Sequence, residues 1–218
     1  MNNKQIFGLV GFIGSGKDTV AKILETEYYF TRISYAQSVK DALSNIFGWR
    51  RELLEGTTKY SRVWREQVDT WWSQRLGIPE FTPRFAMQHF GTNVCRDHFH
   101  NDIWVASLER KLLNASNNVV VSDCRFTNEI SSLRNAGGKI IWVQRGPMPV
   151  WYDQALQIML HEVDLEQRNR KLLALGVHVS EMDWLTNTFD YVLYNHGNLE
   201  QLAENVKNLV SGLQVATE

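Results

Sequence analysis

A glycine-rich segment near the start of the chain ends in a lysine. Residues 11–17 read GFIGSGK, a complete match to G-x-x-x-x-G-K, and they lie between an apolar run and a helical pattern. In such a loop, backbone N–H groups point inward, and the helix N-terminus and the lysine add positive charge that attracts phosphate. A glycine-rich turn with a coincidental lysine is the alternative. The strand and helix on either side favour a phosphate-binding loop, with Lys17 reaching the outer phosphates.

The residue after the lysine is a carboxylate, Asp18, where phosphate loops usually have a Ser or Thr that ligates Mg²⁺. A carboxylate can bind the metal directly or through water, and the metal together with Lys17 would offset its repulsion of phosphate. The first helical turn also favours an anion. We therefore expect Asp18 to hold Mg²⁺, with a plain helix cap as the alternative. The residues expected to bind ATP are Gly14, Ser15, Gly16, Lys17, Asp18 and Thr19.

A second acidic position follows the apolar run of residues 119–121. Asp123 stands where a Walker-B acid is expected, and Arg125 follows two residues later. An aspartate there can order water on Mg²⁺ or accept a hydrogen bond from a substrate sugar, and an arginine can offset the charge of a transferring phosphoryl group. A structural Asp–Arg pair is the alternative.

One segment in the middle of the chain combines arginine with tryptophan. Arg62 and Arg65 are three residues apart on a helical pattern with tryptophans around them, which suits a phosphate and a base. A core stripe with solvated arginines is the alternative.

A polar stripe is predicted on the helix that Thr82 is expected to cap. At about 100° per residue the stripe includes a glycine, which lets a ligand approach closely, and three apolar residues are expected on the opposite side. A plain surface helix is the alternative. The stripe consists of Arg84, Gln88, Gly91 and Thr92, and the opposite side of Phe85, Val94 and Phe99.

Apolar runs alternate with helical patterns, which predicts an α/β fold with a mainly parallel central sheet and right-handed crossovers. Two further helical segments interrupt this alternation and are expected to be insertions over the strand ends, where open parallel sheets bind ligands. The predicted strands are residues 6–10, 32–35, 119–121, 139–144 and 191–194, the predicted helices are 18–27, 37–47, 128–136 and 199–210, and the insertions are 49–99 and 147–183.

Composition limits the class of protein. The chain has 218 residues, of which 44% are hydrophobic and 22% charged, as in a soluble globular domain. A net charge of −1 argues against binding to long nucleic acid. Two cysteines suit a reducing cytoplasm, no apolar run suits a membrane span, and the N-terminus does not resemble a signal peptide. His98, His100 and His161 lack a further ligand at zinc spacing.

Several segments resemble the deoxynucleoside monophosphate kinases of tailed bacteriophages. GSGKDT resembles their phosphate loop, although animal phosphomevalonate kinases share the Gly-Lys-Asp variant. The resemblance extends over residues 8–210 and includes SYAQSVKDALSNIFGW, TPRFAMQHFGTNVCRDHF, VVVSDCRFTNE and a His-Val-Ser-Glu stretch at residues 178–181. It implies that the deoxynucleotide is contacted by Lys40, Arg84, Gly91, Thr92 and Trp104, and that Asn195 belongs to a loop beside the ATP adenine. A plain helix-surface lysine is the alternative for Lys40, and a tight turn alone is the alternative for Asn195.

The resemblance implies a P-loop kinase of one domain, residues 1–218. Its core would comprise residues 1–48, 100–145 and 186–218, with a helical monophosphate-binding insertion at 49–99 and a lid at 146–185 whose closure excludes water. It would transfer the ATP γ-phosphoryl group to a deoxynucleoside monophosphate in the cytoplasm of the host cell. Lys40, Arg84 and Arg125 would clamp the acceptor phosphate.

Two other functions stay open. The chain could phosphorylate another small acceptor, such as dephospho-coenzyme A or phosphomevalonate, or it could be a nucleotide-binding switch without catalysis. The arginine- and tryptophan-rich insertion argues against a switch, because a switch needs no second nucleotide pocket. The sequence does not fix the oligomeric state, and a homodimer stays open.

Overall fold

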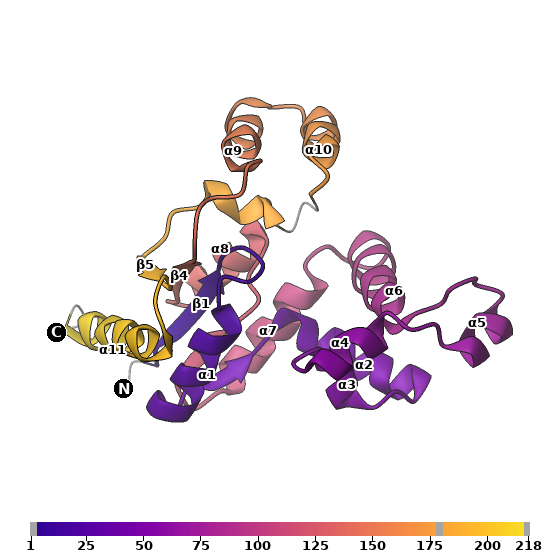
Figure 1. Cartoon of the computed structure of the whole chain (residues 1–218), viewed down its shortest axis with the longest axis horizontal. Coiled ribbons are helices and arrows are strands. Elements are labelled where there is room, and N and C mark those ends of the chain that lie inside the picture. The colour runs from indigo at the N-terminus through magenta and orange to yellow at the C-terminus, as the bar shows by residue number, and fades with distance from the viewer. Residues whose placement is uncertain (1–3, 178–180, 216–218) are drawn as a thin grey trace. The chain divides into compact units, whose positions relative to one another are not determined.

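The computed structural model describes residues 4–177 and 181–215 (Figure 1). The chain forms two compact units, which we call the sheet unit (residues 1–34 and 109–218) and the helical unit (residues 35–108). The helical unit is therefore one continuous segment inserted into the sequence of the sheet unit. The sequence predicts a helical insertion over residues 49–99, and the helical unit also includes helix α2 (Tyr35–Phe47).

Among the described residues, five strands form one sheet in the order β2-β3-β1-β4-β5, and all neighbouring strands are parallel. The α/β fold with a parallel central sheet is thus confirmed. The predicted strand at residues 32–35 is displaced, because the next helix already begins at Tyr35. The strands are β1 (Ile6–Val10), β2 (Thr31–Ile33), β3 (Val119–Val121), β4 (Lys139–Gln144) and β5 (Tyr191–Tyr194).

Helices cover both faces of the sheet, because successive side chains of a strand point to opposite faces. Phe7 and Leu9 are buried in one cluster with side chains of α1 (Lys17–Tyr28) and α11 (Leu199–Val215). Gly8 faces α8 (Thr127–Asn135), and a Cβ atom added to it would lie 2.6 Å from Cδ1 of Leu133. Glycine at position 8 therefore allows α8 to pack closely on the sheet.

The carboxyl ends of the parallel strands lie along one edge of the sheet, which is where such folds bind ligands. The phosphate loop, residues 11–17, follows β1 at this edge. The segment between β4 and β5 contains α9 (Tyr152–His161), α10 (Leu165–Ala174) and the short helix η3 (Asp183–Thr186). Phe12 of the loop packs against Trp184, with 5.0 Å between ring centroids, so this segment contacts the loop.

The helical unit is built from short helices with defined caps. The side chain of Thr82 accepts a hydrogen bond from the backbone N–H of Phe85, and Pro83 occupies the first turn, so the predicted helix start is confirmed. α7 (Ile103–Asn114) passes from this unit into the sheet unit. The other helices are α2, α3 (Arg51–Glu55), α4 (Lys59–Arg65), α5 (Thr70–Leu76), α6 (Pro83–Gln88) and the π-helix η1 (His89–Asp97).

Aromatic side chains form the interior of the helical unit. Phe47 stacks on Trp49 with 4.5 Å between ring centroids, and Trp64 and Trp72 pack edge-on against this pair. The indole N–H groups of Trp49 and Trp72 donate hydrogen bonds to Asp69 and to the Phe47 carbonyl. Trp64 and Trp72 therefore belong to a core, which favours the core alternative for them, whereas Trp71 is exposed.

The π-helix overturns part of the predicted stripe. The α-helical spacing used for it ends at Gln88, because the next nine residues form i→i+5 hydrogen bonds. Gly91 is buried, whereas Gln88 and Thr92 are exposed, so these residues do not share one face. The apolar side predicted opposite is also wrong, since Phe85, Val94 and Phe99 are all exposed.

Candidate active site

The phosphate loop joins β1 to α1, as predicted. Gly11 and Gly16 have φ angles of 144° and 99°, in the region that favours glycine. Space is also short: an added Cβ would lie 2.4 Å from the Val143 carbonyl oxygen at Gly11, and 2.3 Å from the Asn195 amide nitrogen at Gly16. Glycine is therefore required at both positions by conformation and by packing.

Lys17 turns its ammonium group back into the loop. Its Nζ atom donates hydrogen bonds to the carbonyl oxygens of Gly11 at 2.6 Å and Phe12 at 3.0 Å. Burial, followed by the nearby charge of Arg125, lowers the pKa of Lys17 to about 8, although Glu181, Asp18 and Asp123 act in the opposite direction. A phosphate at the loop would supply the anion that this partly desolvated cation lacks.

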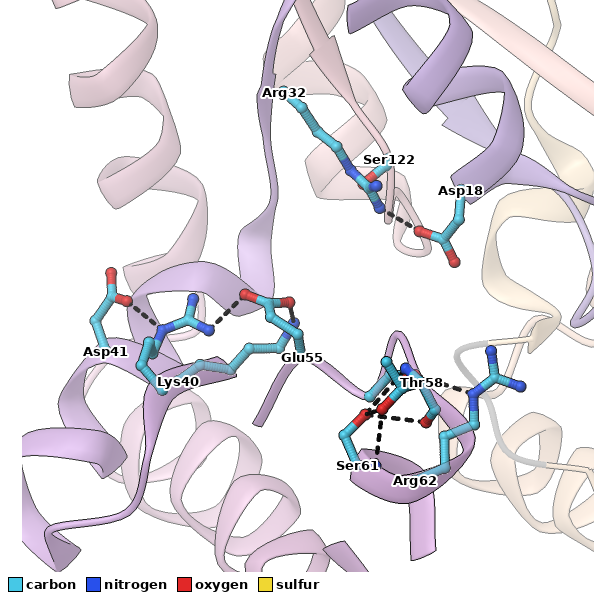
Figure 2. A network of polar contacts seen from close by, with 11 residues as sticks. Asp18, Arg32, Lys40, Asp41, Glu55, Thr58, Ser61, Arg62 and Ser122 are labelled. Carbon is cyan, nitrogen blue, oxygen red and sulfur yellow. Dashed lines mark hydrogen bonds and ion pairs between the residues drawn. The ribbon is translucent and has the colours of Figure 1, made fainter. Parts of the chain in front are cut away.

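Asp18 is bound by an arginine that the sequence analysis does not single out. The Arg32 guanidinium contacts Oδ1 of Asp18, and its Nε atom donates a hydrogen bond of 3.0 Å to the Ser122 hydroxyl (Figure 2). Gly16, not Asp18, is the cap residue of α1, and its cap has no side-chain hydrogen bond. The plain-cap alternative for Asp18 is therefore not what the structure shows. No spacing motif links a strand arginine to this loop, and only the sheet order brings Arg32 to it.

The Asp18 carboxylate fits a role in holding Mg²⁺. Its side chain is 85% exposed, and Arg32 contacts only one of its two oxygens. In kinase sites Mg²⁺ commonly uses one or two protein carboxylates together with substrate phosphates and water. Within residues 4–177 and 181–215 no group of three or more His, Cys, Asp or Glu side chains could hold a metal by itself. A single loop carboxylate is thus compatible with a metal that arrives with a nucleotide.

Asp123 and Arg125 lie in the loop after β3, which ends at Val121. The Arg125 guanidinium forms an ion pair with Glu181, and its backbone N–H donates to the carboxylate of Glu129, at 2.9 Å. Glu129 is 2% exposed and also accepts from the next backbone N–H, so it shapes this loop. Glu181 ends the predicted His-Val-Ser-Glu stretch, whose residues 178–180 lie outside the described part of the chain.

Asn195 stabilises the phosphate loop through a hydrogen bond from its side chain. Its side-chain amide donates a hydrogen bond of 2.9 Å to the Ser15 carbonyl, and its backbone N–H donates to Gln144. The side chain is buried, so this placement indicates a structural role for a residue that the resemblance assigns to the adenine side. The buried Ser15 hydroxyl has no hydrogen-bond partner among the described residues, which leaves it available to a ligand.

The segment expected to act as a lid contains three candidate cations. Arg170 pairs with Glu166 and Lys171 with Glu162, both at the surface. Arg168 differs, because its buried Nε atom has no hydrogen-bond partner within the described ranges. Of the three, Arg168 is therefore the one with a buried N–H donor that has no partner among the described residues.

Several cations of the helical unit are held by carboxylates. Lys40 is 13% exposed in its side chain and donates to Glu55 at 2.6 Å, and Arg51 bridges Glu55 to Asp41 (Figure 2). Arg84 donates to Glu66 at 2.7 Å. Lys40 is thus a half-buried, paired lysine and not the plain surface lysine of an exposed helix.

Arg62 and Arg65 converge on Gly56. The Nε atom of Arg62 donates a hydrogen bond of 3.0 Å to the Gly56 carbonyl. Figure 2 shows Arg62 beside Thr58 and Ser61 at the start of α4. The Arg65 guanidinium lies directly over the same glycine, where an added Cβ would be 2.1 Å from its Nη2 atom. The buried Nε of Arg65 has no hydrogen-bond partner in the part of the chain that the structure describes. Burial and the neighbouring charges of Arg84 and Arg62 lower its pKa.

Gly91 and Trp104 contact each other inside the helical unit. The Trp104 indole N–H donates a hydrogen bond of 2.8 Å to the Gly91 carbonyl, and Trp104 is 8% exposed. A Cβ on Gly91 would lie 3.6 Å from Val39, which is an ordinary contact. This glycine thus faces the interior of its unit, and a larger side chain there would crowd Val39 as well as any ligand.

Comparison with known proteins identifies relatives of this chain. A family model described as deoxynucleotide monophosphate kinase matches residues 73–154. A candidate deoxynucleotide monophosphate kinase of Acanthamoeba polyphaga mimivirus is 31% identical over 154 residues, which cover 64% of this chain and 74% of the viral protein.

Solved structures that the chain is similar to are more distant in sequence. A dephospho-CoA kinase from Campylobacter jejuni is 16% identical with a TM-score of 0.47, covering 96% of this chain and 97% of that one. A shikimate kinase from Aquifex aeolicus is 12% identical with a TM-score of 0.42, covering 97% and 98%. Neither likeness bears on the substrate. No helix in the described ranges is long and apolar enough to cross a membrane.

Proposed function

Because the chain belongs to the deoxynucleotide monophosphate kinase family, we propose that it phosphorylates deoxynucleoside 5′-monophosphates to diphosphates with ATP, supplying precursors of DNA. One observation carries the proposal: each compact unit has its own group of cations that could bind phosphate. Lys17 lies in the loop of the sheet unit, and Arg62, Arg65 and Arg84 lie together in the helical unit. Phosphoryl transfer between two phosphorylated molecules needs two such groups, whereas a nucleotide switch needs one.

The sheet unit would bind the donor nucleotide. The loop backbone and Lys17 would hold the β- and γ-phosphates, with Ser15 and Thr19 offering hydroxyl groups. Asn195 would keep the loop in shape through its bond to Ser15. Arg125, held by Glu181 in the free protein, would turn its charge toward the transferring group.

Asp18 would hold Mg²⁺, with Asp123 placed to order its water shell or to accept from the acceptor sugar. When bound with ATP, Mg²⁺ neutralises phosphate charge and polarises the group to be transferred. The protein's contribution is charge and position, because phosphoryl transfer needs little covalent chemistry from side chains.

The helical unit would bind the acceptor. Lys40 and Arg84 are each held by a carboxylate, Glu55 and Glu66, and a phosphate dianion could replace either carboxylate as the partner. Arg62 and Arg65 add two guanidinium groups beside them. The exposed Gln88 and Thr92 remain candidates for polar contacts with the nucleotide, whereas Gly91 and Trp104 would shape the pocket from within the unit.

A coupled ADP-release assay over all deoxy- and ribonucleoside monophosphates tests the proposal. We expect turnover that requires ATP, Mg²⁺ and at least one deoxynucleoside monophosphate. Dephospho-coenzyme A and phosphomevalonate serve as control acceptors, because kinases for them share parts of the loop. Turnover with a control acceptor alone would replace the proposed substrate, and the absence of turnover with every acceptor would favour a switch.

A further inference from the structure

Arg32 pairs with the carboxylate of Asp18, the residue that follows the lysine of the phosphate loop. It reaches Asp18 from β2, a strand at the edge of the sheet, and its Nε atom is fixed by the buried Ser122 hydroxyl after β3. The two bonds use different nitrogen atoms of the planar guanidinium fork, a geometry that a lysine cannot reproduce. Asp18 is thereby paired in the nucleotide-free protein, and its position is tied to two strand ends.

This pairing affects ATP and Mg²⁺ in opposite directions. Without metal, an unpaired Asp18 would repel the phosphates of ATP, so the neighbouring guanidinium favours their binding. With metal, the same guanidinium competes with Mg²⁺ for the carboxylate. Removal of Arg32 should therefore weaken metal-free ATP binding and strengthen the response to Mg²⁺.

We propose that Arg32 is a positioning residue that holds the Asp18 carboxylate in the free protein. When the metal–nucleotide complex binds, this carboxylate leaves Arg32 and binds Mg²⁺ instead. The inference rests on the proposed function, in that it takes the loop to bind ATP with Mg²⁺. During the exchange Arg32 keeps its bond to Ser122, so the displaced guanidinium stays beside the phosphates. This accounts for a carboxylate next to a triphosphate site: its charge is cancelled until the metal arrives.

The test is a calorimetric titration of ATP into the full chain, first with a chelator and then over a series of free Mg²⁺ concentrations. For Arg32→Gln we expect the metal-free ATP Kd to rise, and the Mg²⁺ concentration giving half of the gain in ATP affinity to fall. Each change should be about two- to five-fold, the range for one partly exposed ion pair. A merely structural role would not move the two quantities in opposite directions.

Two further variants keep the test decisive if Arg32→Gln folds poorly. Arg32→Lys retains the charge but not the fork, so its Mg²⁺ midpoint should lie between those of the wild type and Arg32→Gln. In an Asp18→Asn background, Arg32→Gln should leave the Mg²⁺ midpoint unchanged, because the carboxylate for which the two cations compete is gone. Thermal unfolding of each variant checks the fold.

The outcomes separate the inference from the proposed function. Opposite shifts that vanish in the Asp18→Asn background support the exchange. A midpoint that stays the same or rises in Arg32→Gln, while wild type binds ATP in a Mg²⁺-dependent manner, overturns the inference alone. Wild type that binds no ATP at any Mg²⁺ concentration overturns both.

Discussion

The phosphate loop and the cations of the helical unit hold positive charge in different ways. Lys17 donates to two carbonyl oxygens of its own loop, so its partners come from backbone that the glycines fix in one shape. Lys40 and Arg84 are held by Glu55 and Glu66, which are side chains of other helices. A carbonyl dipole leaves a cation short of an anion, whereas a carboxylate occupies the position that a phosphate would take. The loop is therefore set for its ligand, whereas Lys40 and Arg84 must exchange partners.

The strongest test of the loop side is Lys17→Ala. We expect phosphoryl transfer to fall at least about 100-fold, since a preorganised charge at the transferring group is lost. Stability at neutral pH should not fall, because burial lowers the pKa of Lys17 and its charged form therefore opposes folding there. ADP release and thermal unfolding measure the two effects. Lys22→Ala, an exposed lysine of the same helix paired with Glu25, is the control and should have near-native activity. A near-native rate for Lys17→Ala would contradict the assignment of residues 11–17 as a phosphate-binding loop.

The corresponding test of the helical unit is Arg84→Ala. Loss of one charge-assisted contact should raise the Kd for a deoxynucleoside monophosphate by about 10- to 150-fold and leave ATP affinity unchanged. Separate calorimetric titrations of the two ligands measure this. Arg75→Ala, an exposed arginine of the same unit, provides the matched control. Equal losses for both variants would mean that only the general charge of the unit matters.

The pH dependence of ATP binding sharpens the comparison, because the buried Lys17 titrates and the arginines do not. With a pKa of about 8 in the free protein, Lys17 loses its proton above pH 8, and ATP affinity should be about tenfold lower at pH 9. The unfolded chain keeps that proton up to about pH 10.5, so the lysine's effect on the free energy of unfolding becomes more favourable between pH 8 and 10.5.

Lys17→Arg is the control for this pH profile. An arginine keeps its charge over the whole range, so its ATP affinity should be nearly constant from pH 7 to about 9. Calorimetry at each pH measures the Kd. A wild-type profile as flat as that of Lys17→Arg would show that Lys17 stays protonated in the free protein, against the lowered pKa.

The smallest expected effect separates Arg65 from the other arginines. In Gly56→Ala the new methyl group displaces the Arg65 guanidinium, while the charge of the protein is unchanged. We expect deoxynucleotide affinity to fall about two- to five-fold, comparable to one misplaced surface charge.

Gly77→Ala is the control for the backbone strain that Gly56→Ala introduces. The two glycines have φ angles of 68° and 67°, each ends a helix of the same unit, and Gly77 has open space around it. Both variants should lose a similar amount of stability, roughly 1 kcal/mol. If both bind the deoxynucleotide equally well, Arg65 does not contact it.

The sequence predicts the sheet unit more completely than the helical unit, and the reason is physical. β1 and β4 are apolar runs bounded by turns, and the loop motif depends on glycine conformation, so local signals suffice. In the helical unit the α-helical spacing stops at Gln88, where a π-helix begins, and no residue type announces that change. The predicted stripe fails there for this reason.

The site shows the same division. Lys17 and its loop follow from spacing, whereas Arg32 is brought to Asp18 by the order of strands in the sheet. Asn195 could be read only as a turn or a nucleotide contact, because its bond to Ser15 spans 180 residues of sequence. Contacts between distant segments depend on the assembled fold, which no local pattern encodes.

The insertion of the helical unit into the sequence of the sheet unit has a consequence for protein synthesis. β1 pairs with β3 and β4, so the strand made first has no neighbour until residues 119–144 have been added. At 5–20 residues per second, the roughly 110 intervening residues take about 5 to 20 s. During that time residues 35–108 can fold as one continuous segment, while the apolar β1 remains an unpaired edge that a chaperone could cover. We therefore expect the nascent chain to acquire protease-resistant helical structure before the ATP-binding loop exists in folded form.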